Sequence, residues 1–106
     1  MEVRWTKKAQ FMVGDILDYT SQSFGNLQAN KLKAAFRRIN KYIKQYPRMG
    51  QIELELEDFE GEYRYVMVNK VFKVIYLIES PELVFVIAVW NCRQSPNELK
   101  NIISNN

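Results

Sequence analysis

Three basic residues, Arg64, Lys73 and Arg93, lie in or beside segments that are otherwise apolar. Direct pairing of two strands across a two-residue turn at 69–70 would make Arg64 and Lys73 diagonal neighbours on one face of a sheet. Arg93 follows the last predicted strand and would lie close to the same surface. Such a cluster could hold phosphate, stabilise the charge that develops on a cleaved phosphodiester, or bind the carboxylates of an acidic partner. A register shift of one residue would separate Arg64 from Lys73.

Three tyrosines in the same strands, Tyr63, Tyr65 and Tyr76, could stack on a base or act as general acids, although strand tyrosines more often serve packing. The chain has no histidine, which excludes a histidine general base and histidine metal ligands. Its single cysteine, Cys92, cannot form an internal disulfide, and one cysteine without histidine argues against a zinc site. We therefore expect no metal and no cofactor, and a reducing compartment.

Basic and acidic residues are unevenly distributed along the chain. Residues 1–50 carry ten Lys and Arg against three Asp and Glu, and residues 51–106 carry five against nine, which leaves a net charge of +3. The basic charge concentrates in a predicted helix without acidic residues, where the candidates for binding a target or a nucleic acid are Lys33, Arg37, Arg38, Lys41 and Lys44. The alternative is a solvated helix face that the acidic segment 53–62 partly compensates.

Composition indicates one ordinary globular domain over residues 1–106. Hydrophobic residues make up 47% and charged residues 25% of the chain, which argues against disorder. No apolar run reaches the roughly 18 residues that a membrane span needs. The first residues lack the apolar core of a secretory signal. We expect a cytoplasmic protein without a membrane partner.

The first half of the sequence predicts a helical hairpin. After a short extended segment over 2–5, Thr6 can cap a helix whose apolar residues recur at helical spacing. Gly25 suits a left-handed helix end, and Asn26 suits the cap of a second helix that ends before Pro47. The two helices would lie side by side, with a short connection.

The second half changes to the two-residue period of β-strands. Apolar residues alternate with glutamates over 52–57, which predicts a half-buried strand with its carboxylates in water. Three more strands are expected over 63–68, 72–79 and 83–90, and their short connections favour an antiparallel meander. Ser95 and Pro96 predict the start of a short terminal helix. The expected class is α+β: an N-terminal helical hairpin packed on a four-stranded, mainly antiparallel sheet, with a short lead-in strand and a short C-terminal helix.

The last two predicted strands are apolar on nearly both faces, whereas two helices can cover only one face of a sheet. The uncovered strip could meet another chain, since large exposed apolar patches mark interaction sites. Alternatively, the sheet curls and buries both faces locally. The sequence leaves these two arrangements open.

The order of these elements resembles the RelE/ParE superfamily of type II toxins, and three stretches carry the resemblance. Residues 3–9 resemble its first strand and helix start, residues 63–66 and 72–79 resemble its central hairpin, and residues 89–96 resemble its last strand and the segment that follows. The resemblance runs through nearly the whole chain. It implies a toxin that is neutralised by a cognate antitoxin, commonly through an acidic, partly disordered tail.

The superfamily resemblance implies one of two activities. RelE-like members cut messenger RNA on the ribosome without metal, and ParE-like members poison DNA gyrase. Arg64, Lys73 and Arg93 fall near positions where the RNA-cleaving members use lysine and arginine. However, Val66 stands where a further lysine is expected, and the residues just after Arg93 include neither the tyrosine nor the histidine that such enzymes place there. These departures favour the gyrase-directed activity; a ribosome-dependent endoribonuclease and a non-toxic binding module of the same fold are the alternatives.

Overall fold

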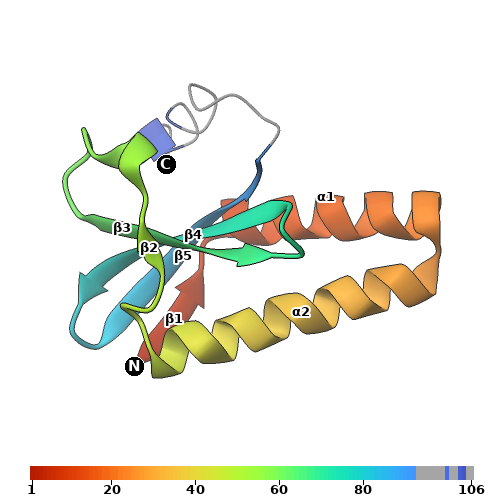
Figure 1. The fold of residues 1–106 in the computed structure, drawn as a ribbon, viewed down its shortest axis with the longest axis horizontal. Helices are drawn as coiled ribbons and strands as arrows, with labels where there is room; N and C mark the ends of the chain where they lie inside the picture. The colour runs from red at the N-terminus through yellow and green to blue at the C-terminus, as the bar shows by residue number, and fades with distance from the viewer. Residues whose placement is uncertain (93–99, 101–102, 105–106) are drawn as a thin grey trace.

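A computed structural model describes residues 1–92, Lys100 and residues 103–104 (Figure 1). In chain order its elements are β1 (Glu2–Trp5), α1 (Lys7–Phe24), α2 (Asn26–Gln45), β2 (Gln51–Ile52), the 3₁₀ helix η1 (Leu54–Leu56), β3 (Glu62–Val68), β4 (Phe72–Ser80) and β5 (Leu83–Asn91). Two helices pack on one sheet, so the predicted α+β class is confirmed. Within the described part of the chain, no helix has both the length and the apolar character that crossing a bilayer requires.

The helical hairpin forms where the sequence predicts it. The Thr6 side chain caps α1 by accepting a hydrogen bond from the backbone N–H of Ala9 at 3.1 Å. Gly25, with a φ of 93°, turns the chain from α1 into α2 at a backbone angle that residues with a Cβ rarely adopt. One face of α2, which includes Phe36 and Ile43, is then buried in the core.

The sheet has five strands in the order β1-β5-β4-β3-β2, one more than the predicted four. The additional strand is the lead-in segment, β1, which runs parallel to β5 while the other neighbours are antiparallel. The backbone N–H groups of Glu2 and Thr6 donate to the carbonyl oxygens of Glu82 and Val86 at 2.8 and 3.0 Å. β1 therefore forms one edge of the sheet, directly beside the last strand.

The predicted strand over 52–57 is wrong. Only the two residues of β2 pair with β3, and the chain then turns into η1. Glu53 is 2% exposed instead of lying in water, because its carboxylate accepts hydrogen bonds from Lys73 Nζ at 3.0 Å and from the backbone N–H of Glu55 at 3.2 Å. Leu56 consequently becomes part of a hydrophobic cluster with residues of β4 and β5.

Both faces of the sheet are buried at its centre. One cluster joins residues of α1 and α2 with Val74 and Tyr76 of β4. A second cluster joins Leu56 of η1 with Ile75 and Trp90, which lie on the other face. Local burial of both faces, one of the two arrangements left open by the sequence, is thus confirmed for the centre of the sheet.

The predicted start of the terminal helix at Ser95 lies outside the described residues. Lys100, Ile103 and Ser104 have helical backbone, and Ile103 packs against the second cluster. The Lys100 Nζ lies 3.4 Å from the carboxylate of Asp58. The end of the chain therefore contacts the segment that follows η1.

Candidate functional site

Arg64 and Lys73 lie on opposite faces of the sheet, so the predicted cluster on one face is wrong. Arg64 pairs with Tyr76, which belongs to the cluster beneath the helices. Lys73 pairs with Met67. Paired residues share a face, and successive residues of a strand alternate between faces. The two cations therefore cannot converge on one phosphate.

The turn between β3 and β4 is one residue longer than predicted, and this shifts the pairing of the two strands by one residue. Asn69 and Lys70 both adopt left-handed φ angles, 53° and 59°, and the Val71 N–H closes the turn on the Val68 carbonyl at 3.2 Å. The Val71 carbonyl in turn accepts a hydrogen bond from the Cys92 N–H at 2.9 Å. Val71 thus remains in the turn, and β4 begins to pair with β3 one residue later than predicted.

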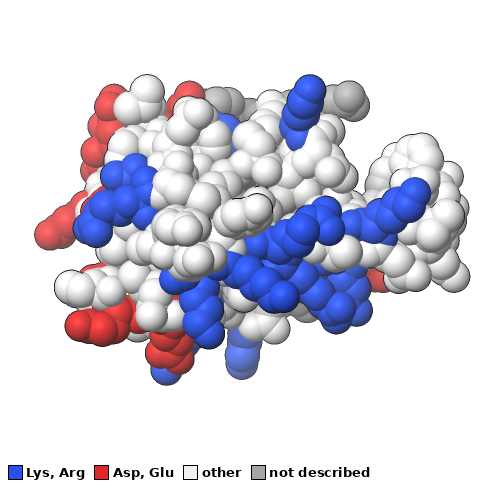
Figure 2. Space-filling view, turned by 60° about the horizontal axis from the view of Figure 1, so that its bottom comes forward, with Lys and Arg blue, Asp and Glu red and all other residues white. Residues whose placement is uncertain are grey.

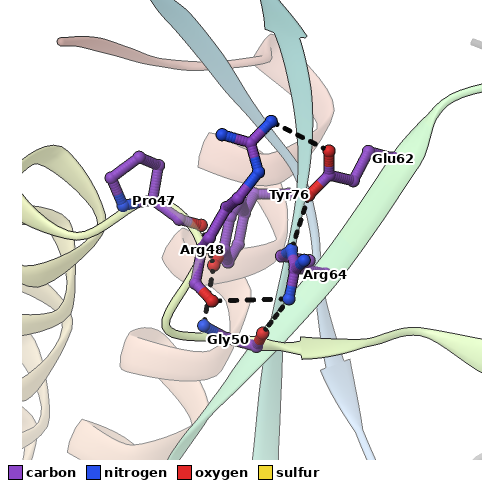
Figure 3. Close-up of polar contacts among 6 residues, drawn as sticks. All are labelled: Pro47, Arg48, Gly50, Glu62, Arg64 and Tyr76. Atoms are coloured by element: carbon purple, nitrogen blue, oxygen red, sulfur yellow. Dashed lines mark hydrogen bonds and ion pairs between the residues drawn. The ribbon is translucent and has the colours of Figure 1, made fainter. Parts of the chain in front are cut away.

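Arg64 instead holds the turn that connects α2 to β2 (Figure 3). Its Nε donates to Glu62 Oε2 at 2.7 Å, and its Nη1 donates to the Gly50 carbonyl at 2.7 Å. The Tyr76 hydroxyl donates to the Pro47 carbonyl at 2.6 Å and accepts from the Gly50 N–H at 3.2 Å. Burial raises the pKa of Tyr76, which keeps this donor protonated, and full burial prevents Tyr76 from stacking on a base. We call this arrangement the Arg64–Tyr76 clamp.

The Glu62 carboxylate is shared between two arginines. The hydrogen bond from Arg64 holds the pKa of Glu62 below its ordinary value, although burial partly opposes the effect. Arg48 Nη2 lies 3.2 Å from the other carboxylate oxygen. A carboxylate with a depressed pKa in the folded state stabilises the fold above its ordinary pKa, and that stabilisation is lost as the pH falls through the folded-state pKa. Acid therefore weakens the clamp.

Lys73 makes a second fixed contact, beneath the opposite face. Its Nζ lies 3.0 Å from Glu53 Oε2 and 4.2 Å from the centre of the Tyr65 ring. The Lys73 side chain is 23% exposed and Glu53 is almost fully buried. Arg64 and Lys73 therefore both make contacts that stabilise the fold. Arg93, the third residue of the predicted basic cluster, lies outside the described residues.

The α2 residues predicted to bind a target or a nucleic acid are all exposed: Lys33, Arg37, Arg38, Lys41 and Lys44. With the exposed Lys31 they form what we call the α2 basic face. α2 contains no acidic residue, and none of these six cations forms an ion pair with another described residue. Figure 2 shows Lys and Arg side chains gathered in a band across this side of the molecule, with most Asp and Glu near one end. The structure thus brings the predicted residues together on one surface.

An open groove of about 650 Å³ lies between α1, α2 and β1, and the sequence analysis did not anticipate it. Its walls are mainly apolar (Val3, Trp5, Val13, Leu17 and Phe36), and Lys33, Arg37 and Lys41 of the α2 basic face also line it. Trp5 Nε1 donates to Asn40 Oδ1 at 2.7 Å, which fixes the indole in the groove. One signal of this groove was present in the sequence, because the apolar residues Val3 and Trp5 alternate with charged residues in β1. Only the position of β1 in the sheet, however, places these two side chains beside the helices.

Comparisons with known proteins agree with this fold. The family model described as "ParE toxin of type II toxin-antitoxin system, parDE" matches residues 3–96. A solved structure described as "Chromosomal ParDE TA system from P. aeruginosa" contains a similar chain, with a TM-score of 0.69 and 17% sequence identity over 86% of this chain and 95% of that chain. At this identity the structural likeness supports the fold alone. No curated protein matches the sequence.

Proposed function

This chain belongs to the ParE toxin family of type II toxin–antitoxin systems, and from that membership we propose that it stops bacterial growth by poisoning DNA gyrase in the cytoplasm. The match over residues 3–96 carries this proposal. It makes the chain a ParE-like toxin and implies a cognate antitoxin as its partner.

The positions of Arg64 and Lys73 support gyrase over messenger RNA as the target. Metal-free cleavage of RNA needs positive groups that converge on one phosphodiester. Here the two residues lie on opposite faces of the sheet, and each is held by a carboxylate, Glu62 or Glu53. These contacts give both residues a role in the fold, which supports the proposal of a toxin that does not cleave RNA.

Gyrase poisoning predicts the order in which synthesis fails after the toxin is induced without its antitoxin. Incorporation of labelled thymidine should fall first, while labelled amino acids continue to enter protein during the first minutes. Purified toxin should also inhibit DNA supercoiling by purified gyrase. A prompt stop in protein synthesis would instead indicate RNA cleavage on the ribosome. Unimpaired growth with folded toxin present would favour a non-toxic binding module, and growth restored by the antitoxin is the control.

The groove is the site that we propose for the antitoxin. An acidic amphipathic segment fits its chemistry, because apolar side chains would contact Trp5, Val13 and Leu17 while carboxylates meet Lys33 and Arg37. The segment would bury both kinds of surface at once. This arrangement would cover part of the α2 basic face.

Leu17→Glu should weaken antitoxin binding by roughly 10-fold to 30-fold, because it removes apolar contact area and places a carboxylate where an acidic partner docks. Titration calorimetry with purified antitoxin measures the change. Phe11→Glu is the matched control, since Phe11 is on the same helix, is 74% exposed and does not line the groove. Equal losses for the two variants would place the antitoxin elsewhere.

A further inference from the structure

The α2 basic face carries positive charge that no contact within the described fold uses. Its six cations extend from Lys31 to Lys44, about 20 Å along the helix. Lys33, Arg37 and Lys41 follow one another at intervals of four residues, a spacing at which like charges repel and disfavour the helix. None of the six forms an ion pair with a described Asp or Glu. An external polyanion would remove this repulsion.

Outside the groove, where the antitoxin is proposed to dock, the chemistry of the α2 basic face fits phosphates better than it fits a second protein. Between Lys31 and Lys44, Tyr42 is the one large apolar or aromatic side chain that α2 exposes. Protein interfaces usually depend on a few aromatic or apolar anchors at their centre, and this face offers a single tyrosine among its lysines and arginines. Lys, Arg, Asn and Tyr side chains are common phosphate contacts, and the exposed Asn30 and Tyr42 flank the cations.

We propose that the α2 basic face binds duplex DNA through its phosphates, without reading the base sequence. B-DNA carries one phosphate charge for about each 1.7 Å of its axis, so a helix face about 20 Å long meets several phosphates at once. This DNA contact does not depend on the poisoning of gyrase proposed above, and it shares Lys33 and Arg37 with the site proposed for the antitoxin. It is measured without gyrase, so either proposal can fail while the other stands.

Fluorescence anisotropy of the purified toxin with labelled duplexes of about 20 base pairs, at about 50 to 200 mM salt, tests the proposal. Two unrelated sequences should bind equally well. The logarithm of the binding constant should fall with the logarithm of salt concentration, with a slope between about −3.6 and −5.4, as expected for four to six phosphate contacts. No binding at the lowest salt concentration would overturn the proposal.

The double variant Arg38→Gln, Lys44→Gln removes two cations of the α2 basic face that do not line the groove. Each lost phosphate contact should weaken binding about eightfold at 0.1 M salt and reduce the slope by about 0.9. Arg38→Lys with Lys44→Arg should restore most of the affinity, which would exclude a loss caused by misfolding.

A control variant removes the same number of positive charges from a part of the surface outside the α2 basic face. Lys7→Gln with Lys70→Gln alters two exposed lysines outside α2, and it should leave the slope nearly unchanged. Equal effects of the two double variants would overturn the proposal, because net charge alone would then explain binding. Displacement of the DNA by polyglutamate at equal charge concentration would also overturn it, because the α2 basic face would then bind carboxylates at least as well as phosphates.

Discussion

Gly50→Ala should lower the free energy of unfolding by about 3 kcal/mol, at the upper end of the usual cost of overfilling a packed site. A Cβ at position 50 would lie 2.7 Å from the Tyr65 backbone oxygen and would also clash with the Tyr76 hydroxyl. The backbone oxygen belongs to a paired strand and cannot move aside without breaking the sheet. The clash would separate Gly50 from Arg64 and Tyr76, so the clamp on the α2–β2 turn would open.

Urea unfolding followed by circular dichroism measures this loss, and Gly14→Ala is its control. Gly14 lies within α1 and is exposed, and a Cβ added there would have open space around it out to 4 Å. Because alanine favours helix, Gly14→Ala should raise stability by about 0.5 to 1 kcal/mol. The same substitution therefore has opposite signs at the two sites. A Gly50→Ala protein as stable as the wild type would show that the clamp does not hold the turn.

Lys73→Met should destabilise the protein by about 3 kcal/mol, because it leaves the buried carboxylate of Glu53 without its ion-pair partner. The cation over the Tyr65 ring is lost as well. Unfolding by urea is again the measurement. A neutral result would mean that Lys73 is free to serve another purpose, including one in catalysis.

A second substitution separates the structural role of Lys73 from a catalytic one. Glu53→Leu combined with Lys73→Met removes both charges, and an apolar replacement of a buried ion pair is often close to neutral. Because Glu53→Leu also removes the hydrogen bond from the Glu55 N–H, we expect the double variant to be within about 2 kcal/mol of the wild type and to remain toxic. A double variant that folds stably but is harmless would indicate that Lys73 acts on the target.

The elements set by local signals were predictable. The Thr6 cap and Gly25 mark the two ends of the first helix, and the two-residue period of apolar residues identified the long strands. Register was not predictable, because it depends on the left-handed angles of Asn69 and Lys70, a pair that signals its turn less strongly than Asn-Gly does. The one-residue difference moved Arg64 and Lys73 to opposite faces.

The remaining differences come from contacts between distant parts of the chain. The alternation of apolar residues and glutamates over 52–57 fits a strand. In the structure Lys73 supplies an ion-pair partner that allows Glu53 to be buried, and the backbone forms the 3₁₀ helix η1 instead. The α2 basic face was visible in the sequence because all its members lie on one helix. The groove was not visible, because Trp5 reaches the helices only through the pairing of β1 with β5.

The parallel pairing of β1 with β5 also has a consequence for synthesis on the ribosome. β1 emerges first, but its hydrogen-bonding partner, β5, ends at Asn91. At about 5 to 20 residues per second, the intervening stretch of about 85 residues takes about 4 to 17 seconds to translate. During this interval Val3 and Trp5 have no strand beside them, so one wall of the groove does not yet exist. The toxin thus acquires the surface that we propose for the antitoxin late in its own translation, and a nascent chain could not be neutralised there before that point.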